Sequence, residues 1–313
     1  MAEAIKKGVF HIDCMGLEGL QQSFIPLTYS LKNDPLSTTK LRICSNGSFK
    51  RSPGCVSYND TLIQGPDYLN GIDGILLRWR AASSCALADI KSCYHKIRST
   101  KEEMSLRRLW LKPVLGLGST EEWVEGCLGR VSFGDSLGGT VAGTAIFDVA
   151  ENCMSAKAAQ CVEEDTYMDD LLCLEYFDNL SVDDLMQEVD AALKKRDLEV
   201  KGWTKTGDNV PNIKFLNYGY DPYKDTISLR PRVNWSPKRR GARVTDDVKT
   251  VEELKRHMMT YPLTKRSLAS LVMGTLYDPL GLGIPFTNNI KAIYREATRR
   301  AEMDWEDFIP EDL

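Results

Sequence analysis

Three aspartates lie in sequence surroundings that suit metal-dependent chemistry. Asp89 comes near the end of the apolar run 86–90, and Asp169 and Asp170 lie between two apolar or β-favouring segments. This pattern predicts one carboxylate at the end of a buried strand and two at the tip of a hairpin, where the three can meet. Magnesium prefers carboxylate oxygens and keeps places for water and substrate phosphates, so few protein ligands are needed. The three residues would serve phosphoryl transfer with two magnesium ions, which activate an oxygen nucleophile and neutralise a leaving pyrophosphate.

A structural explanation of the aspartate pair is also open. Aspartate is common in tight turns because its side chain forms hydrogen bonds with nearby backbone groups. Judged from the dipeptide alone, the structural interpretation is favoured by roughly four to one. The rest of the sequence therefore has to decide between the two interpretations.

The elements that must position these aspartates mix helices and strands without a strict alternation. Apolar residues at helical spacing predict helices at 66–79, 138–153, 181–193, 251–259 and 264–277. Short apolar or β-branched runs predict strands at 24–27, 41–44, 86–90 and 198–203, and hairpins at 167–174 and 215–229. The fold class is therefore predicted to be α+β.

Length and composition indicate an ordinary globular protein. The chain has 313 residues, of which 42% are apolar and 27% charged, and this length suits one large domain or about two to three smaller ones. The formal net charge of −4 gives no overall basic signal for nucleic acid. One short segment is basic, with Arg230, Arg232, Lys238, Arg239, Arg240 and Arg243. That segment could follow a nucleic-acid backbone or form a solvated loop, and neither interpretation is favoured.

The cysteines and the apolar runs indicate a compartment. The nine cysteines include no CxxC pair and are accompanied by only three histidines, so neither a zinc site nor a disulfide framework is predicted. Free thiols indicate a reducing compartment. No apolar run is long enough to span a bilayer, and the N-terminus lacks the apolar core of a signal peptide. We expect an intracellular, cytoplasmic protein without a membrane partner, with the nucleus or a virus-like particle as alternatives.

Beyond the aspartates, motifs along most of the chain resemble those of reverse transcriptases. Tyr167-Met168-Asp169-Asp170 with its apolar flanks is similar to the signature hairpin of that family. The other similar segments follow in family order: 39–43, 57–60, 65–66, 89–97, 130–134, 203 and 216–220. The segments 264–266, 277–282, 285–286 and 304–307 resemble the Bel/Pao retrotransposon polyprotein downstream of its polymerase. Together they cover 24–313, which is far more specific than any single motif.

The resemblance implies the fold and the activity of a right-hand polymerase. Fingers and palm would be interleaved in 1–245, with an antiparallel palm sheet packed by helices. The segment 246–313 would be helical, like part of a thumb or connection, at the start of the Pao downstream region. The implied activity is that of an RNA-directed DNA polymerase, which adds dNTPs to a primer on an RNA or DNA template. Since no segment resembles a ribonuclease H or integrase, we expect fingers, palm and part of a thumb or connection; the oligomeric state stays open.

The resemblance also implies the roles of the metal-binding and primer-side residues. Asp89, Asp169 and Asp170 would hold two Mg²⁺ ions, for which Mn²⁺ could substitute. The backbone carbonyl of Ile90 would be a further ligand. Met168 would pack near the primer end.

Five further residues are implied in nucleotide binding. Lys40 and Arg42 would face the triphosphate, Arg with bidentate contacts and Lys as a point charge. Taken singly, both would more often be solvated strand residues. Tyr94 stands at the steric-gate position, where an aromatic ring blocks the ribose 2′-hydroxyl; a core aromatic on an apolar strand is about equally favoured for it. Phe133 and Gly134 would line the nucleotide pocket.

Several positions depart from the family pattern without removing a metal ligand. They are Asn46, Ser132, Gly139, Gly202, Asn217 and Tyr220. These departures leave open a second hypothesis, a truncated or domesticated remnant with weak or no catalysis that binds nucleic acid or protein. An aspartic peptidase carries little weight, because the nearest match, 135–138, lacks the glycine of an Asp-Thr/Ser-Gly loop.

Overall fold

The part of the chain that can be described divides into two compact units. The computed structural model describes residues 2–12, 14, 16–31, 41–63, 65–66, 68–111, 122–176, 180–211, 213–216, 218–229, 233–234, 245–246, 252–253, 256, 259, 263–274, 278–300 and 302–310. The first unit comprises Met1–Gly71 and Ala81–Trp203, and the second Ile72–Arg80 and Thr204–Leu313. Lys40, Asn217, the basic residues of 230–243 and most of the predicted helix 251–259 lie outside the described residues. The domain boundary after 245 stays a prediction.

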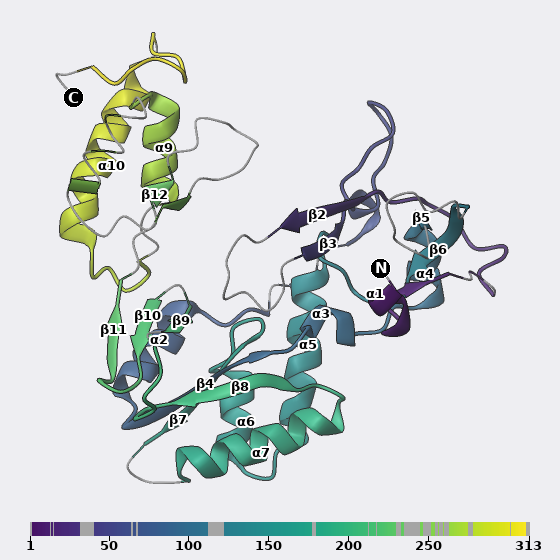
Figure 1. Ribbon diagram of the computed structural model, residues 1–313, viewed down its shortest axis with the longest axis horizontal. Helices are drawn as coiled ribbons and strands as arrows, with labels where there is room; N and C mark the ends of the chain where they lie inside the picture. Colours follow the sequence, from purple (N-terminus) through teal and green to yellow (C-terminus); the bar gives the residue numbers. More distant parts are fainter. Residues whose placement is uncertain are drawn as a thin grey trace. The chain divides into compact units, whose positions relative to one another are not determined.

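The first unit is built around a three-stranded sheet with the strand order β7-β4-β8 (Figure 1). Its strands are β4 (Ser84–Ile90), β7 (Asp170–Glu175) and β8 (Val200–Lys205). β4 and β7 are antiparallel, with a register that runs from Ser84↔Glu175 to Asp89↔Asp170. β4 is buried along most of its length, which explains why its sequence is an apolar run rather than an alternating pattern.

Three helices form a core with one face of this sheet (Figure 1): α5 (Gly138–Ala150), α6 (Ala156–Glu163) and α7 (Val182–Lys195). The sheet residues in this core are alternate residues of two strands, namely Ala86, Ala88, Ile90, Leu171 and Cys173. Because side chains alternate along a strand, Asp89 and Asp170 lie on the opposite face of the sheet.

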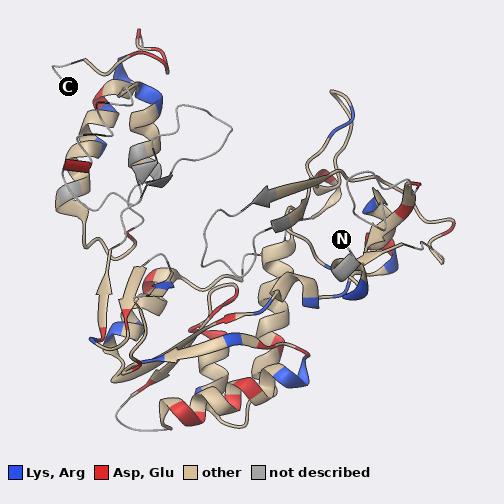
Figure 2. Ribbon diagram, in the orientation of Figure 1, with Lys and Arg blue, Asp and Glu red and all other residues tan. Residues whose placement is uncertain are grey.

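Helix α7 shows how the sequence sets the ends of these helices. Ser181 Oγ accepts a hydrogen bond of 3.2 Å from the Asp184 amide and so caps the start of the helix. Asp183 and Asp184 lie in the first turn, and Lys194 and Lys195 in the last (Figure 2). This charge order complements the helix dipole.

The rest of the first unit consists of short elements. β1 (Phe10–His11), β6 (Val124–Leu128) and β5 (Arg108–Leu111) form a second sheet, in that order, and β2 (Leu27–Leu31) pairs with β3 (Leu41–Ser45). The short helices are α1 (Ala2–Lys6), η1 (Asn59–Thr61), α3 (Cys93–Lys96) and α4 (Lys101–Leu106).

The second unit combines small antiparallel sheets with a helix pair. Its strands are β9 (Ile213–Phe215), β10 (Tyr218–Asp221), β11 (Thr226–Ser228), β12 (Val233–Asn234) and β13 (Thr245–Asp246). Its helices are α2 (Ile72–Ala81, of which Ala81 belongs to the first unit), α9 (Lys265–Gly274) and α10 (Ile284–Arg299). Trp79 of α2 packs edge-on against Phe215 and Tyr220, with ring centroids 5.5 Å and 5.1 Å apart.

The α+β prediction is confirmed, but several element boundaries were wrong: the strand predicted at 198–203 is Val200–Lys205, and the helix predicted at 138–153 ends at Ala150. The helix predicted at 66–79 begins only at Ile72, because the Asn70 side chain instead donates hydrogen bonds to the carbonyls of Glu163 and Thr166. The strand predicted at 24–27 begins only at Leu27; before it, Phe24 makes an isolated bridge to Arg108. In the described part of the chain, every helix is too short or too polar to cross a membrane.

The motif residue Asp278 has a structural task at the start of α10. Its carboxylate accepts hydrogen bonds from the amides of Leu282 (2.9 Å) and Gly283 (2.6 Å), just before the helix begins. We expect Asp278→Ala to lower the free energy of unfolding by about 1–2 kcal/mol, because two donors lose their acceptor. This change in the free energy of unfolding is measured by urea denaturation. Glu296→Ala, which removes only an exposed ion pair with Arg299, is the control and should cost less than about 0.5 kcal/mol; equal losses would contradict the capping role.

Candidate active site

The strand register brings the backbones of the three aspartates to one end of the central sheet. Asp89 of β4 lies directly opposite Asp170 of β7. The amide of Ile90 donates a 2.8 Å hydrogen bond to the carbonyl of Asp169. The predicted meeting of a strand end with a hairpin tip is therefore what the backbone shows.

The hairpin tip is a tight turn with Met168 and Asp169 at its centre. Tyr167 and Asp170 exchange both backbone hydrogen bonds, at 2.9 Å and 3.0 Å. Met168 has φ +55°, which is unusual for a residue with a side chain. Positive φ at the first central residue suits a two-residue hairpin, where glycine or asparagine is the ordinary choice. The backbone conformation of Met168 therefore costs about 1–2 kcal/mol of conformational free energy.

Asp89 has a basic partner on the neighbouring strand. Lys201 Nζ of β8 lies 2.5 Å from Asp89 Oδ1, and the two side chains are 45% and 39% exposed. Among the described residues, no group of three or more His, Cys, Asp or Glu side chains is arranged to hold a metal ion. Carboxylate oxygens are the ligands that magnesium prefers, but the described side chains of the three aspartates are not grouped as a metal site.

Of the predicted nucleotide-binding residues, Tyr94 and Phe133 lie in contact near the start of α5, with Met168 close by. The rings of Tyr94 and Phe133 are 4.9 Å apart. A Cβ at Gly138 would lie 2.9 Å from the Tyr94 ring, and a Cβ at Gly139 would lie 3.9 Å from the Met168 methyl group. Gly138 therefore lets the helix start approach Tyr94 closely, whereas a side chain at Gly139 would make only ordinary contact with Met168.

Tyr94 lies on the short helix α3, so the strand in the alternative interpretation was wrong, whereas the expected packing against the core is observed. Burial, with a smaller effect of the Asp169 carboxylate, raises the pKa of Tyr94. The same causes, joined by Asp89, raise the pKa of Cys93 to about 12. The charges of Asp89 and Asp169 thus act on the side chains of α3.

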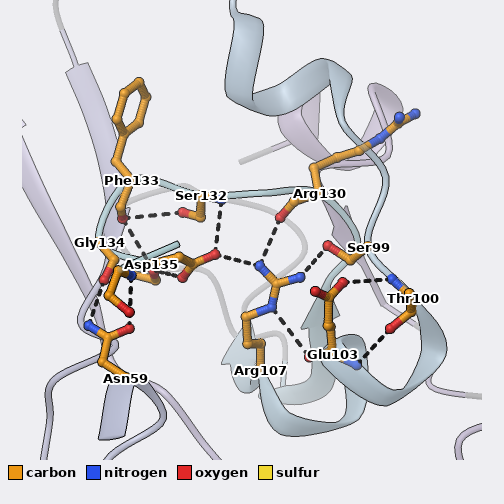
Figure 3. Close-up of polar contacts among 12 residues, drawn as sticks. Asn59, Ser99, Thr100, Glu103, Arg107, Arg130, Ser132, Phe133, Gly134 and Asp135 are labelled. Atoms are coloured by element: carbon orange, nitrogen blue, oxygen red, sulfur yellow. Dashed lines mark hydrogen bonds and ion pairs between the residues drawn. The ribbon is translucent and has the colours of Figure 1, made fainter. Parts of the chain in front are cut away.

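Two side chains fix the backbone of the Phe133 segment (Figure 3). The Phe133 carbonyl accepts hydrogen bonds from the amide of Ser45 (2.8 Å) and from its hydroxyl (3.2 Å). The Gly134 carbonyl accepts one from Asn59 Nδ2 (3.0 Å). Gly134 has φ +109°, and a Cβ there would collide with the Ser45 carbonyl oxygen. Only glycine fits this close approach.

Sequence reasoning missed the residues that hold these segments. Ser45, Asn59, Asn70 and Lys201 act through contacts with residues distant in the sequence. No local pattern marks them, since serine, asparagine and lysine are common on surfaces. Arg42 lies in β3 opposite Ser30; its side chain, like Lys40, lies outside what the structure describes.

The structure accommodates several departures from the family pattern. Gly202 has φ +146°, a conformation that disfavours a side chain at this position of β8. Tyr220 is fully buried, and its hydroxyl lies 2.9 Å from both Thr206 Oγ1 and Asp225 Oδ1. Asp135, the aspartate of the peptidase alternative, is buried in an ion pair with Arg107. It does not offer the shared-proton carboxylate pair that an aspartic peptidase needs.

The chain has a reverse-transcriptase-like fold. No family model matches the sequence, and no curated protein does. Among solved structures it is similar to a foamy viral protease-reverse transcriptase in complex with an RNA/DNA hybrid, with a TM-score of 0.58 and 15% identity over 99% of this chain and 34% of that one. It is also similar to the dRH form in complex with double-stranded DNA, with a TM-score of 0.57 and 15% identity over 97% and 43%. The chain spans less than half the length of either protein.

His95 makes the stability of this region depend on pH. Its ring packs against Phe133, and burial, assisted by the charge of Lys7, lowers its pKa. The unfolded chain therefore binds more protons, and the free energy of unfolding falls as the pH drops below about 6.5. We expect a shallower fall between pH 7 and pH 5 in His95→Gln, measured by urea denaturation. The exposed His11→Gln variant keeps His95 and should follow the parent; identical slopes in all three proteins would refute this.

Proposed function

We propose that the chain is the polymerase part of a retroelement reverse transcriptase of the Bel/Pao type. The observation that carries the proposal is the register that places Asp89 opposite Asp170, with Asp169 at the adjoining turn, in a reverse-transcriptase-like fold. The central sheet with its three helices would be the palm of a right-hand polymerase, and the β2–β3 hairpin part of the fingers. The substrates would be dNTPs and a primer on an RNA or DNA template.

The three aspartates would act as carboxylate ligands of two Mg²⁺ ions, with the Ile90 carbonyl as a further ligand and Mn²⁺ as a substitute. When bound, such ions promote deprotonation of the primer hydroxyl and neutralise charge on the phosphates. Asp89 would first have to leave Lys201. Because both side chains are exposed by more than a third, this ion pair is weak and opens at little cost.

The residues around the start of α5 would select and orient the nucleotide. Tyr94 would exclude a ribose 2′-hydroxyl, supported by the Phe133 ring against which it packs. Phe133 and Gly134 would line the pocket, on a backbone that Ser45 and Asn59 hold in place.

Three further residues complete the proposed site. Lys40 and Arg42 would bind the triphosphate from the fingers strand. Met168, in its left-handed conformation at the hairpin tip, would pack beside the primer end.

A catalytically weak remnant that binds nucleic acid or protein is the second candidate. The pairing of Asp89 with Lys201 and the incomplete ligand set favour it. A remnant that binds nucleic acid would still hold a primer-template, as a polymerase does, but it would not extend the primer.

Primer extension separates the two candidates. The purified chain should extend a primer on an RNA template with Mg²⁺ or Mn²⁺. Asp169→Asn should reduce the rate about a hundredfold or more, because it removes a charged ligand. Asp197→Asn is a matched control: Asp197 is 91% exposed and has φ +57°, which asparagine tolerates. No extension by a folded parent that binds primer-template would leave the remnant as the function.

A further inference from the structure

A buried ion pair anchors the segment that carries Phe133 and Gly134. Arg107 Nη1 lies 2.6 Å from Asp135 Oδ2, and the two side chains are only 2% and 5% exposed. Asp135 directly follows Gly134, whereas Arg107 directly precedes β5 (Figure 3). The pair therefore connects the proposed nucleotide pocket to a part of the chain that contributes no residue to it.

Arg107 uses its other N–H groups to join several backbone segments. Its Nε donates to the carbonyl of Glu103 and its Nη1 to the carbonyl of Arg130, both at 3.3 Å. Its Nη2 donates to the hydroxyl of Ser99. The guanidinium carbon lies 5.8 Å from the ring centroid of Tyr58. The planar fork of arginine is thus fixed on several sides, which no other side chain could reproduce.

Asp135 uses both carboxylate oxygens on the pocket side. Oδ2 also accepts a hydrogen bond from the amide of Ser132 (3.2 Å), and Oδ1 lies 3.1 Å from the Ser45 hydroxyl, whose single proton it shares with the Phe133 carbonyl. Ser45 is the residue whose amide binds the Phe133 carbonyl. The Asp135 carboxylate therefore holds both ends of the segment 132–135 and sets its distance from β3.

Stability alone does not account for such a pair. Burying two charges costs solvation free energy, and their mutual attraction offsets little more than that cost. Proteins with neutral side chains of similar volume in place of such a pair often fold equally well. What a neutral pair cannot do is hold several segments in one relative position through charged hydrogen bonds. The segment held in this way contains Phe133, whose ring packs on Tyr94.

We propose that Arg107 and Asp135 are positioning residues of the nucleotide pocket: their ion pair holds the Phe133 and Gly134 backbone against Ser45, and so keeps the Phe133 ring on Tyr94. The inference rests on the proposed function, since that function assigns these residues to dNTP binding. Neither member of the pair touches the nucleotide; both act through Phe133 and Gly134.

The test is a double variant that removes both charges together. Arg107→Met with Asp135→Asn leaves no unpaired buried charge, and asparagine keeps an acceptor oxygen for the Ser132 amide. Because methionine removes the donor to the Glu103 and Arg130 carbonyls, we expect its melting temperature to fall by a few degrees at most. In primer extension, KM for the dNTP should rise about tenfold or more with kcat changed less than about threefold, because ground-state positioning is lost.

A second readout does not depend on activity. The amide of Ser45 is bonded to the Phe133 carbonyl, so its hydrogen exchange reports whether the segment is in place. In the double variant this amide should exchange at least about tenfold faster. The amide of Leu128, whose acceptor is the Arg107 backbone carbonyl, should keep its rate.

The neighbouring ion pair provides a matched control. Arg108 Nη1 lies 2.5 Å from Glu125 Oε1, with side chains 7% and 35% exposed. The double variant Arg108→Met with Glu125→Gln should leave KM and the Ser45 exchange rate at parent values. A parallel change in this control would show a general effect of lost charge and overturn the proposal.

The remaining outcomes are also decisive. Unchanged KM and unchanged Ser45 exchange in a stable Arg107→Met, Asp135→Asn variant would overturn the positioning role. If the parent itself extends no primer, the proposed function fails, while the Ser45 exchange rate still shows whether the pair positions the segment. If the double variant melts far below the parent, the pair is a stability element and the proposal is likewise overturned.

Discussion

The antiparallel register between β4 and β7 is the constraint on which the site depends. A shift of one residue would move Asp89 away from Asp170 and would exchange the side chains of one strand between the two faces of the sheet. Both faces of these strands are buried, so the register follows from side-chain size: a slip would place Leu87 where the smaller Ala86 and Ala88 pack against the helices that cover the sheet. The packing of an ordinary core thus determines where the carboxylates lie, on the face that this core does not use.

Around this sheet, close backbone approaches and polar anchors complete the site. Glycines at 134 and 138 let the backbone approach Ser45 and Tyr94 at distances that a side chain would prevent or restrict. The positive φ of Met168 and the burial of the Arg107–Asp135 ion pair also depart from the local structure of lowest free energy. Such departures are typical of functional sites, where geometry is kept at the expense of stability.

The sequence predicted the sheet and its carboxylates well because the signals are local. An apolar run that ends near Asp89 and a turn at 169–170 between apolar segments can be read from neighbouring residues. The anchors could not be read, because Asn70, Asn59 and Arg107 bind backbone groups far away in the sequence. For the same reason the helix start predicted at residue 66 was too early. The hydrogen bonds of Asn70 to residues distant in the sequence outweighed a weak helical preference.

Direct detection of metal at the three carboxylates tests the central claim. Crystals of the chain soaked in Mn²⁺ with a primer-template and a dNTP would be measured at the manganese absorption edge, where anomalous scattering identifies the ion. The account predicts manganese coordinated by Asp89, Asp169 and Asp170, with Lys201 moved away from Asp89. Manganese bound elsewhere or not at all, with the Asp89–Lys201 ion pair intact beside an ordered dNTP, would contradict it.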